Sequence, residues 1–168
     1  MRRVISQAMR FASAAIAILF IASCAHQTSI TSTNDIKNGP WAGRISLQIQ
    51  SEPPQAFFAG FELSGQAEQG ELRLTSPIGS TLGVMRWSAT DAVLESGRDV
   101  KHFASLDELL EQTTGAAVPV TALFDWLGGK NTSLGGWTAD LTQQGKGKIT
   151  ARRSSPAPQI ELRLVQDQ

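Results

Sequence analysis

Apolar and polar residues alternate through most of the chain after residue 40. In four segments apolar side chains recur at every second position: 45–49, 57–63, 71–74 and 82–87. Alternation with a period of two is typical of a strand that buries one face. Two shorter strands are expected at 91–96 and 100–104, joined by the turn Ser96-Gly97-Arg98-Asp99. Short successive strands with such turns predict an antiparallel meander, a sheet that can curl into a barrel.

Two short helices are expected to interrupt the strands. Ser105 and Glu108 have the spacing of a capping box, in which each residue bonds a free backbone N–H near the other. This helix is expected to stop at Gly115, and a second helix to follow Pro119 over residues 120–127. The apolar side chains of the pair fall on one side: Leu106, Leu109, Leu110, Leu123, Phe124 and Leu127.

The strand pattern returns at the end of the chain. Strands are expected at 136–142, 148–153 and 159–165, with a turn at 144–147. A curved antiparallel sheet packed on one side by the two helices is the simplest way to bury both sets of apolar residues. The sequence therefore predicts a mainly β domain at 41–168 with two or three short helices.

The N-terminal segment has a different composition. Three arginines precede an apolar run at 11–22, which at about a dozen residues is shorter than the ~20 that a membrane span needs. A basic start followed by a short apolar run is typical of a secretory signal peptide. The run ends in Ile21-Ala22-Ser23-Cys24, the pattern of a bacterial lipobox, in which the cysteine is acylated. We therefore expect a lipoprotein signal peptide at 1–23 and a lipidated, flexible tether at 24–40.

Cys24 is the only cysteine of the chain, so it has no partner for an intramolecular disulfide. The alternative to a lipobox is an ordinary signal peptide that happens to be followed by this cysteine. Acylation with two or more chains would anchor the protein stably to a membrane. In the bacterial sorting rule an Asp after the lipidated cysteine favours the inner membrane, and this chain has Ala25, which points to the outer membrane.

Charge and motifs give little sign of catalysis. Removal of 1–23 takes the net charge from zero to −3, because three arginines leave and all 15 acidic residues stay, and a weakly acidic domain is not expected to bind nucleic acid. His26 and His102 have no second ligand at metal spacing, and no nucleophile elbow or phosphate-binding loop is present. We therefore expect no metal, no cofactor and no enzymatic activity.

The loop at 75–81, Thr-Ser-Pro-Ile-Gly-Ser-Thr, has polar turn chemistry around one large apolar residue. Pro77 and Gly79 flank Ile78 at its centre. Either Ile78 folds back into the core, or it meets something outside the protein, and a membrane is the partner we expect for Pro77, Ile78 and Gly79.

Several segments resemble the outer-membrane lipoprotein receptor family LolB. Residues 72–81 resemble the family segment L-x-L-T-x-P-L-G-S-T, and Ala56-Phe57-Phe58-Ala59-Gly60-Phe61 is similar to its preceding aromatic strand. Residues 108–115 resemble its first helix, and 118–120 with 123–128 resemble the segment leading into its L-x-x-W-x-x-G helix. The resemblance covers most of 41–129 in collinear order and weakens after residue 129.

The resemblance implies a fold and a role. The fold is an open antiparallel half-barrel of about eleven strands with a helical lid over an apolar cavity. The role is that of a monomeric receptor, lipid-anchored in the outer membrane and facing the periplasm. It would accept client lipoproteins from the periplasmic carrier LolA, bind their acyl chains, and insert them into the inner leaflet of the outer membrane.

The apolar alternation supplies candidates for the cavity wall, for each of which ordinary core packing is the alternative: Ile45, Leu47, Phe57, Phe61, Leu72, Leu74, Leu82 and Val84. The six apolar helix residues named above are expected to form the face of the lid. Two other functions stay open. One is a lipid-anchored binding protein for another hydrophobic ligand, and the other is a passive structural lipoprotein.

Overall fold

The computed structural model describes residues 39–167, which belong to one compact unit. The expected signal peptide, Cys24 and nearly all of the expected tether lie outside the described residues. The elements of the domain are, in chain order, β1 (Trp41–Ile49), β2 (Gln55–Gln66), β3 (Gln69–Thr75), β4 (Thr81–Trp87), β5 (Ala92–Ser96), β6 (Asp99–Phe103), α2 (Leu106–Thr114), α3 (Val120–Leu127), β7 (Trp137–Asp140), the 3-10 turn η2 (Gln144–Lys146), β8 (Lys148–Arg153) and β9 (Ile160–Gln166).

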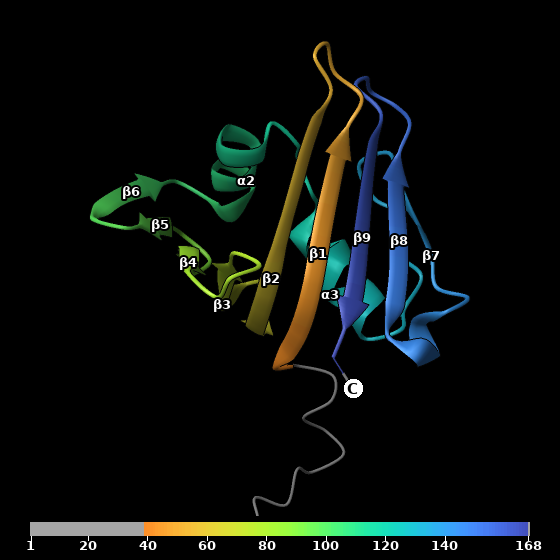
Figure 1. Ribbon diagram of the computed structural model, residues 1–168, viewed down its shortest axis with the longest axis horizontal. Helices are drawn as coiled ribbons and strands as arrows, with labels where there is room; N and C mark the ends of the chain where they lie inside the picture. The colour runs from red at the N-terminus through yellow and green to blue at the C-terminus, as the bar shows by residue number, and fades with distance from the viewer. Residues whose placement is uncertain (1–38, 168) are drawn as a thin grey trace, which may run out of the picture. The chain divides into compact units, whose positions relative to one another are not determined.

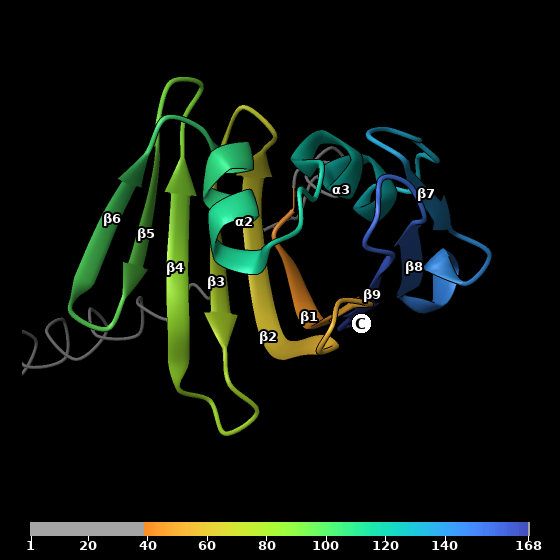
Figure 2. The same cartoon turned by 90° about the horizontal axis from the view of Figure 1, so that it is seen from above.

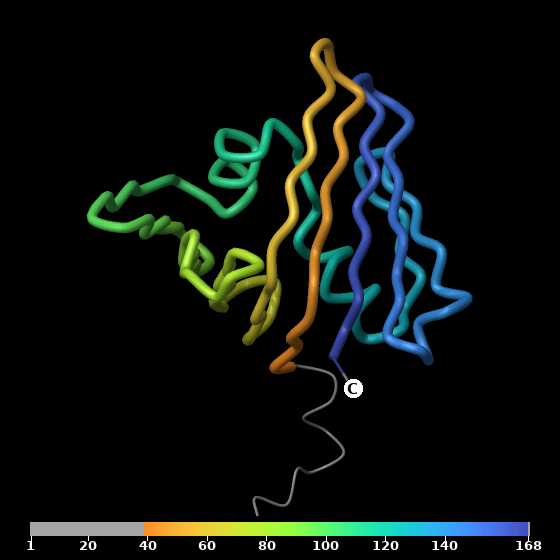
Figure 3. Tube along the Cα trace, in the orientation of Figure 1, coloured from red at the N-terminus to blue at the C-terminus, as the bar shows by residue number. Residues whose placement is uncertain are grey.

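All nine strands form one antiparallel sheet in the order β6-β5-β4-β3-β2-β1-β9-β8-β7 (Figure 1). The first six strands make a meander, and the last three make a second meander that joins the first where β9 pairs with β1. The Cα trace shows the two chain segments running side by side although more than a hundred residues separate them in sequence (Figure 3). The predicted fold class is confirmed, with nine strands among the described residues where the resemblance implied about eleven.

The sheet is curved, and both helices lie on its inner side (Figure 2). We call this the concave face and the opposite one the convex face. The alternation sets the two faces: Leu47 of β1 lies opposite Phe57 of β2 and Leu162 of β9, so their side chains share the concave face. The convex face carries the polar positions between them. A core of buried apolar residues fills the space between the concave face and the helices.

Helix α2 begins and ends where the sequence predicts. The hydroxyl of Ser105 accepts a hydrogen bond from the backbone N–H of Glu108 at 3.2 Å, and Gly115 closes the helix in the left-handed conformation that glycine adopts at low cost. The Glu108 carboxylate accepts from the backbone N–H of Ala104 at 2.8 Å, one residue before the cap. Both ends of α2 are therefore capped by residues next to the helix.

Helix α3 is held by aromatic side chains at both of its sides. Phe124 packs edge-on against the rings of Trp41 and Trp87, with centroids 5.5 and 6.3 Å away. On the other side, Trp126 contacts Trp137 of β7, and each of these indoles donates a hydrogen bond to a backbone carbonyl, at 2.8 and 2.9 Å. A buried Trp usually finds a partner for its N–H. The Trp137 bond to Ala117 joins β7 to the segment before α3, and the Trp126 bond to Thr132 joins α3 to the segment after it.

The cap of α2 supplies a test of the fold. Replacing Ser105 with Ala removes the acceptor for the Glu108 N–H and is expected to lower the free energy of unfolding by about 1 kcal/mol. Urea denaturation followed by tryptophan fluorescence measures the change. Ser105→Asp keeps an acceptor at the cap and should stay within a few tenths of a kcal/mol of the parent. Equal losses in both variants would contradict the capping role.

Candidate functional site

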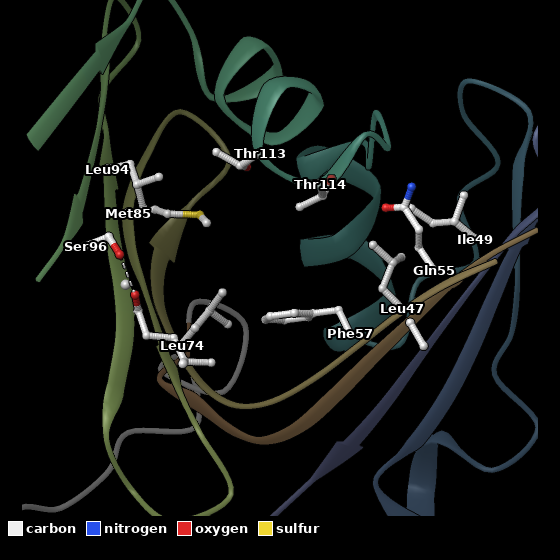
Figure 4. Close-up of a pocket in the computed structure, with 13 residues that line it drawn as sticks. Leu47, Ile49, Gln55, Phe57, Leu74, Met85, Leu94, Ser96, Thr113 and Thr114 are labelled. Carbon is white, nitrogen blue, oxygen red and sulfur yellow. Dashed lines mark hydrogen bonds between the residues drawn. The ribbon is translucent and has the colours of Figure 1, made fainter. Parts of the chain in front are cut away.

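A cavity of about 360 Å³ lies on the concave face, between strands β1 to β5 and the last turn of α2 (Figure 4). Its volume falls within the range of ~300–1,000 Å³ typical of small-ligand sites. The lining is mostly aliphatic, and it contains no ionisable side chain: Leu47, Ile49, Gln55, Ala56, Phe57, Leu74, Leu82, Gly83, Met85, Leu94, Ser96, Thr113 and Thr114.

A second, smaller hollow of about 70 Å³ adjoins the first and runs beneath the helices. The two share five lining residues, Leu47, Phe57, Leu74, Met85 and Thr114. The rest of the smaller hollow is formed by α2, α3 and the central strands. The apolar space therefore reaches from the exposed rim at β2 and β4 into the interior beneath the helical pair.

The hydroxyl groups of the cavity are satisfied within the protein. Thr113 and Thr114 donate to the carbonyls of Leu109 and Leu110, each at 2.7 Å, and Ser96 donates to the carbonyl of Leu82 at 3.0 Å. These bonds occupy the donors, so the surface offered to a ligand is largely hydrocarbon. Such a cavity binds by removing apolar area from water, at ~25 cal/mol per Å².

The structure brings together most of the predicted wall residues. Leu47, Phe57 and Leu74 line both hollows, Ile45 and Leu72 line the smaller one, and Leu82 lies on the rim of the larger. Phe61 is buried in the core and borders neither hollow.

Val84 lies on the other side of the sheet from this group. It pairs with Arg73 and Glu95 on the convex face, where it is buried outside the core cluster. Strand β4 has apolar residues on both faces, so alternation alone leaves the choice of face open. Pairing decides it: Met85, opposite Leu72 and Leu94, takes the cavity position.

Leu82 reaches the cavity rim through an irregularity. Leu74 pairs with Gly83, but the next residue, Thr75, pairs with Thr81, so Leu82 is an extra residue in β4. A bulge of this kind lets a side chain leave the strict alternation of its strand. Sequence patterns do not reveal such a shift, because it depends on how two strands meet.

The predicted lid residues divide into two groups. Leu106, Leu110 and Leu123 line the smaller hollow. Leu109 and Leu127 are buried in helix packing, and Phe124 contacts the rings of Trp41 and Trp87. The first group covers the smaller hollow, and the second group packs the helices against the rest of the domain.

Several lining residues were missed by the sequence reasoning. Met85 and Leu94 had a usable signal, since each occupies an apolar position of a predicted strand. Thr113, Thr114 and Gln55 had none, because polar residues at the end of a helix or strand give no sign of facing a cavity.

The loop between β3 and β4 holds Ile78 away from the core. Its side chain is 89 % exposed, the highest value for a large apolar residue in the described part of the chain. The Ser76 carbonyl accepts from the N–H of Gly79 at 2.9 Å, and the Ser76 hydroxyl accepts from the N–H of Ser80 at 3.1 Å. Gly79 has a φ of 85°, which supports this tight turn. The structure therefore shows the exposed arrangement of Ile78 and not the core-packed one.

The convex face is charged, in contrast to the cavity. Arg86 donates to Glu95 at 2.6 Å and to Glu71 at 2.8 Å, and these bonds raise the pKa of Arg86 above its usual value. Burial alone would raise the pKa of Glu161, but hydrogen bonds and charge from Arg152 and Arg163 outweigh it and lower the pKa. The ionised forms of these groups are thus favoured, so the convex face remains charged and hydrated.

Within residues 39–167 no group of three or more His, Cys, Asp or Glu side chains is placed to hold a metal ion. No helix in this part of the chain is long and apolar enough to cross a membrane.

Curved sheet, helical cover and apolar cavity together define an open half-barrel of the kind that can enclose a hydrocarbon. The sequence matches the family described as Outer membrane lipoprotein LolB over residues 40–164. The chain therefore belongs to the LolB family of outer-membrane lipoproteins, which confirms the resemblance and the expected location.

Individual relatives agree with this assignment. The Outer-membrane lipoprotein LolB of Bordetella petrii is 28% identical over 147 residues, which cover 74% of this chain and 74% of the relative. The proteins of the same name from Cupriavidus metallidurans and Ralstonia nicotianae are each 27% identical, over 82% and 79% of this chain and 69% and 67% of their own lengths.

Neighbouring residues of β5 offer a matched test of the cavity. Leu94 lines the cavity, whereas Val93 faces the convex side. Leu94→Trp should fill part of the empty volume. Excluding about two methylenes of a ligand costs about 1.6 kcal/mol, or roughly a fifteen-fold loss of affinity for a fluorescent sixteen-carbon fatty acid. Val93→Trp should leave that affinity unchanged. If both variants bind the probe like the parent, the cavity is not its binding site.

Proposed function

We propose that this protein is the outer-membrane receptor that accepts lipoproteins from the periplasmic carrier LolA and inserts them into the outer membrane. Its cavity would hold the acyl chains of the client during the transfer. The observation that carries the proposal is the apolar cavity left open beneath the helices of a LolB-family chain. The client chains have the chemistry that such a lining favours, because the lining offers hydrocarbon and no charge.

The energy of exposed hydrocarbon explains why a receptor is needed. At ~0.8 kcal/mol per methylene, an acyl chain of about sixteen carbons costs on the order of 13 kcal/mol to expose to water. A lipoprotein with several such chains cannot cross the periplasm unprotected at a useful rate. The cavity of a carrier, and then of the receptor, must replace the membrane around the chains.

No covalent change is needed for the transfer. The chains pass from one apolar environment to another, and only a difference in affinity drives each step. We propose that the receptor binds the acyl chains more tightly than the carrier does. The bilayer in turn holds these chains more tightly than the receptor does. The partly open cover of the cavity, formed by two short helices, suits this role because the chains must leave as well as enter.

Attachment and delivery would fall to different parts of the chain. We propose that residues 1–23 are removed, that acylated Cys24 anchors the protein, and that residues up to 40 tether the domain at 41–168, which works as a monomer. The loop of Pro77, Ile78 and Gly79 would then enter the inner leaflet beside the cavity. Burial of one isoleucine gains about 1.5–3 kcal/mol, which biases the loop toward the bilayer without holding it there.

Transfer between purified components tests the proposal. The chain from residue 24 with Cys24→Ser should strip an acylated lipoprotein from carrier-bound complex, measured by co-purification of the client with each protein. A client that stays with the carrier would contradict the receptor function. Binding of free fatty acid without any transfer would instead favour storage of another hydrophobic ligand.

Delivery can be separated from acceptance with one substitution. Ile78→Glu should accept the client as the parent does, because Ile78 is exposed and lines neither hollow, but should deliver it to vesicles at least tenfold more slowly. Leu134→Glu is the matched control, since Leu134 is also an exposed apolar residue (48 %) and lies beside the edge strand β7, in the other half of the sheet. Loss of acceptance or of folding in Ile78→Glu would contradict the role of the loop.

A further inference from the structure

Two consecutive phenylalanines of β2 face opposite sides of the sheet. Phe57 lines the cavity, and Phe58 stands on the convex face with 58 % of its surface exposed. Full burial of such a side chain would gain ~1.5–3 kcal/mol, and the described residues leave more than half of Phe58 uncovered. Phe58 is therefore available to an external apolar partner.

Phe58 shares a surface with the β3–β4 loop. A hollow of about 220 Å³ on the convex face is lined by both Phe58 and Pro77, the residue next to Ile78. Gly60 contributes no side chain to it and pairs with Arg44 on one side and Thr75 on the other. Figure 2 shows the β3–β4 connection projecting past the bend of β2.

Arg44 in this hollow differs from four other arginines of the convex face. Arg73, Arg86, Arg152 and Arg163 all form salt bridges with glutamates. Arg44 lines the hollow, is exposed, and forms no salt bridge with any described residue. A free cation beside an exposed aromatic ring is suited to the interface of a phospholipid bilayer, where phosphate lies above hydrocarbon.

We propose that Phe58 and Arg44 form a second membrane contact beside the Ile78 loop, with a bilayer containing anionic phospholipid as its partner. The inference rests on the proposed function, and it adds the orientation of the domain on the membrane. A single loop in the leaflet leaves the domain free to rotate about that point, and a second contact fixes the rotation. Phe57 of the cavity wall and Phe58 are consecutive residues of β2, so a contact between Phe58 and the bilayer would keep this end of the cavity wall near the membrane.

Vesicle binding tests this contact. The chain from residue 24 with Cys24→Ser carries no lipid anchor of its own, so its binding to phosphatidylethanolamine–phosphatidylglycerol vesicles reports the protein surface. Phe58→Ser should weaken this binding roughly tenfold, and Phe58→Leu should keep most of it. Arg44→Gln should weaken it about fivefold on these vesicles, and have no effect on neutral phosphatidylcholine vesicles or at high salt.

The controls separate this contact from folding and from the proposed function. Leu134→Ser should bind vesicles like the parent, and each variant should keep the parent affinity for the fatty-acid probe. Unchanged vesicle binding in Phe58→Ser, or an equal loss in Leu134→Ser, would overturn the inference. Failure of the parent to accept a client from the carrier would overturn the proposed function instead, whatever the vesicles show.

A label placed on this surface gives an independent reading. Cys24 is the only cysteine of the chain, so Cys24→Ser allows one new cysteine to carry an environment-sensitive fluorophore. A label at Phe58→Cys should shift to shorter wavelength on vesicles, a label at Ile78→Cys should do the same, and one at Leu134→Cys should not. A label at position 58 that stays in water while the one at position 78 enters the bilayer would contradict the second contact.

Discussion

The concave face of the sheet is larger than the two helices that must cover it. Nine strands spaced at ~4.8 Å make a sheet about 38 Å across. Helices α2 and α3 have nine and eight residues, so at 1.5 Å per residue they are only about 13 and 12 Å long. Aromatic contacts fix α3 over the middle of the sheet, which leaves the area beside the last turn of α2 open. The cavity is the apolar surface that this mismatch leaves without a partner.

The alternation of side chains along the strands separates the site from the solvent-facing surface. The cavity contains no charge and its hydroxyls are bonded within the protein, whereas the convex face carries ion pairs that favour water. Strand β2 belongs to both, since Phe57 faces the cavity and Phe58 faces outward beside the loop of Ile78. A short segment of chain therefore connects the place where acyl chains would be held with the surface that would meet the membrane.

Local patterns in the sequence predicted much of this structure. The limits of α3 and β8 match the expected ranges, and the cap of α2 lies at Ser105 as the spacing to Glu108 indicates. Features that depend on how strands pair with one another could not be predicted from these local patterns. The choice between Val84 and Met85 at the cavity required the pairing of β3, β4 and β5, and the position of Leu82 required a bulge. The count of about eleven strands came from the resemblance, which weakens after residue 129, whereas the described residues form nine.

Met85 offers the most direct test of the claim that acyl chains occupy the cavity. It lines both hollows, and it is the only methionine after residue 9, so a labelled methionine methyl group gives one assignable NMR signal from the domain. With a triacylated cysteine peptide bound, we predict a shift of this signal and nuclear Overhauser contacts between the Met85 methyl group and the acyl methylenes. A peptide that binds while the Met85 signal neither shifts nor contacts the chains would contradict the account.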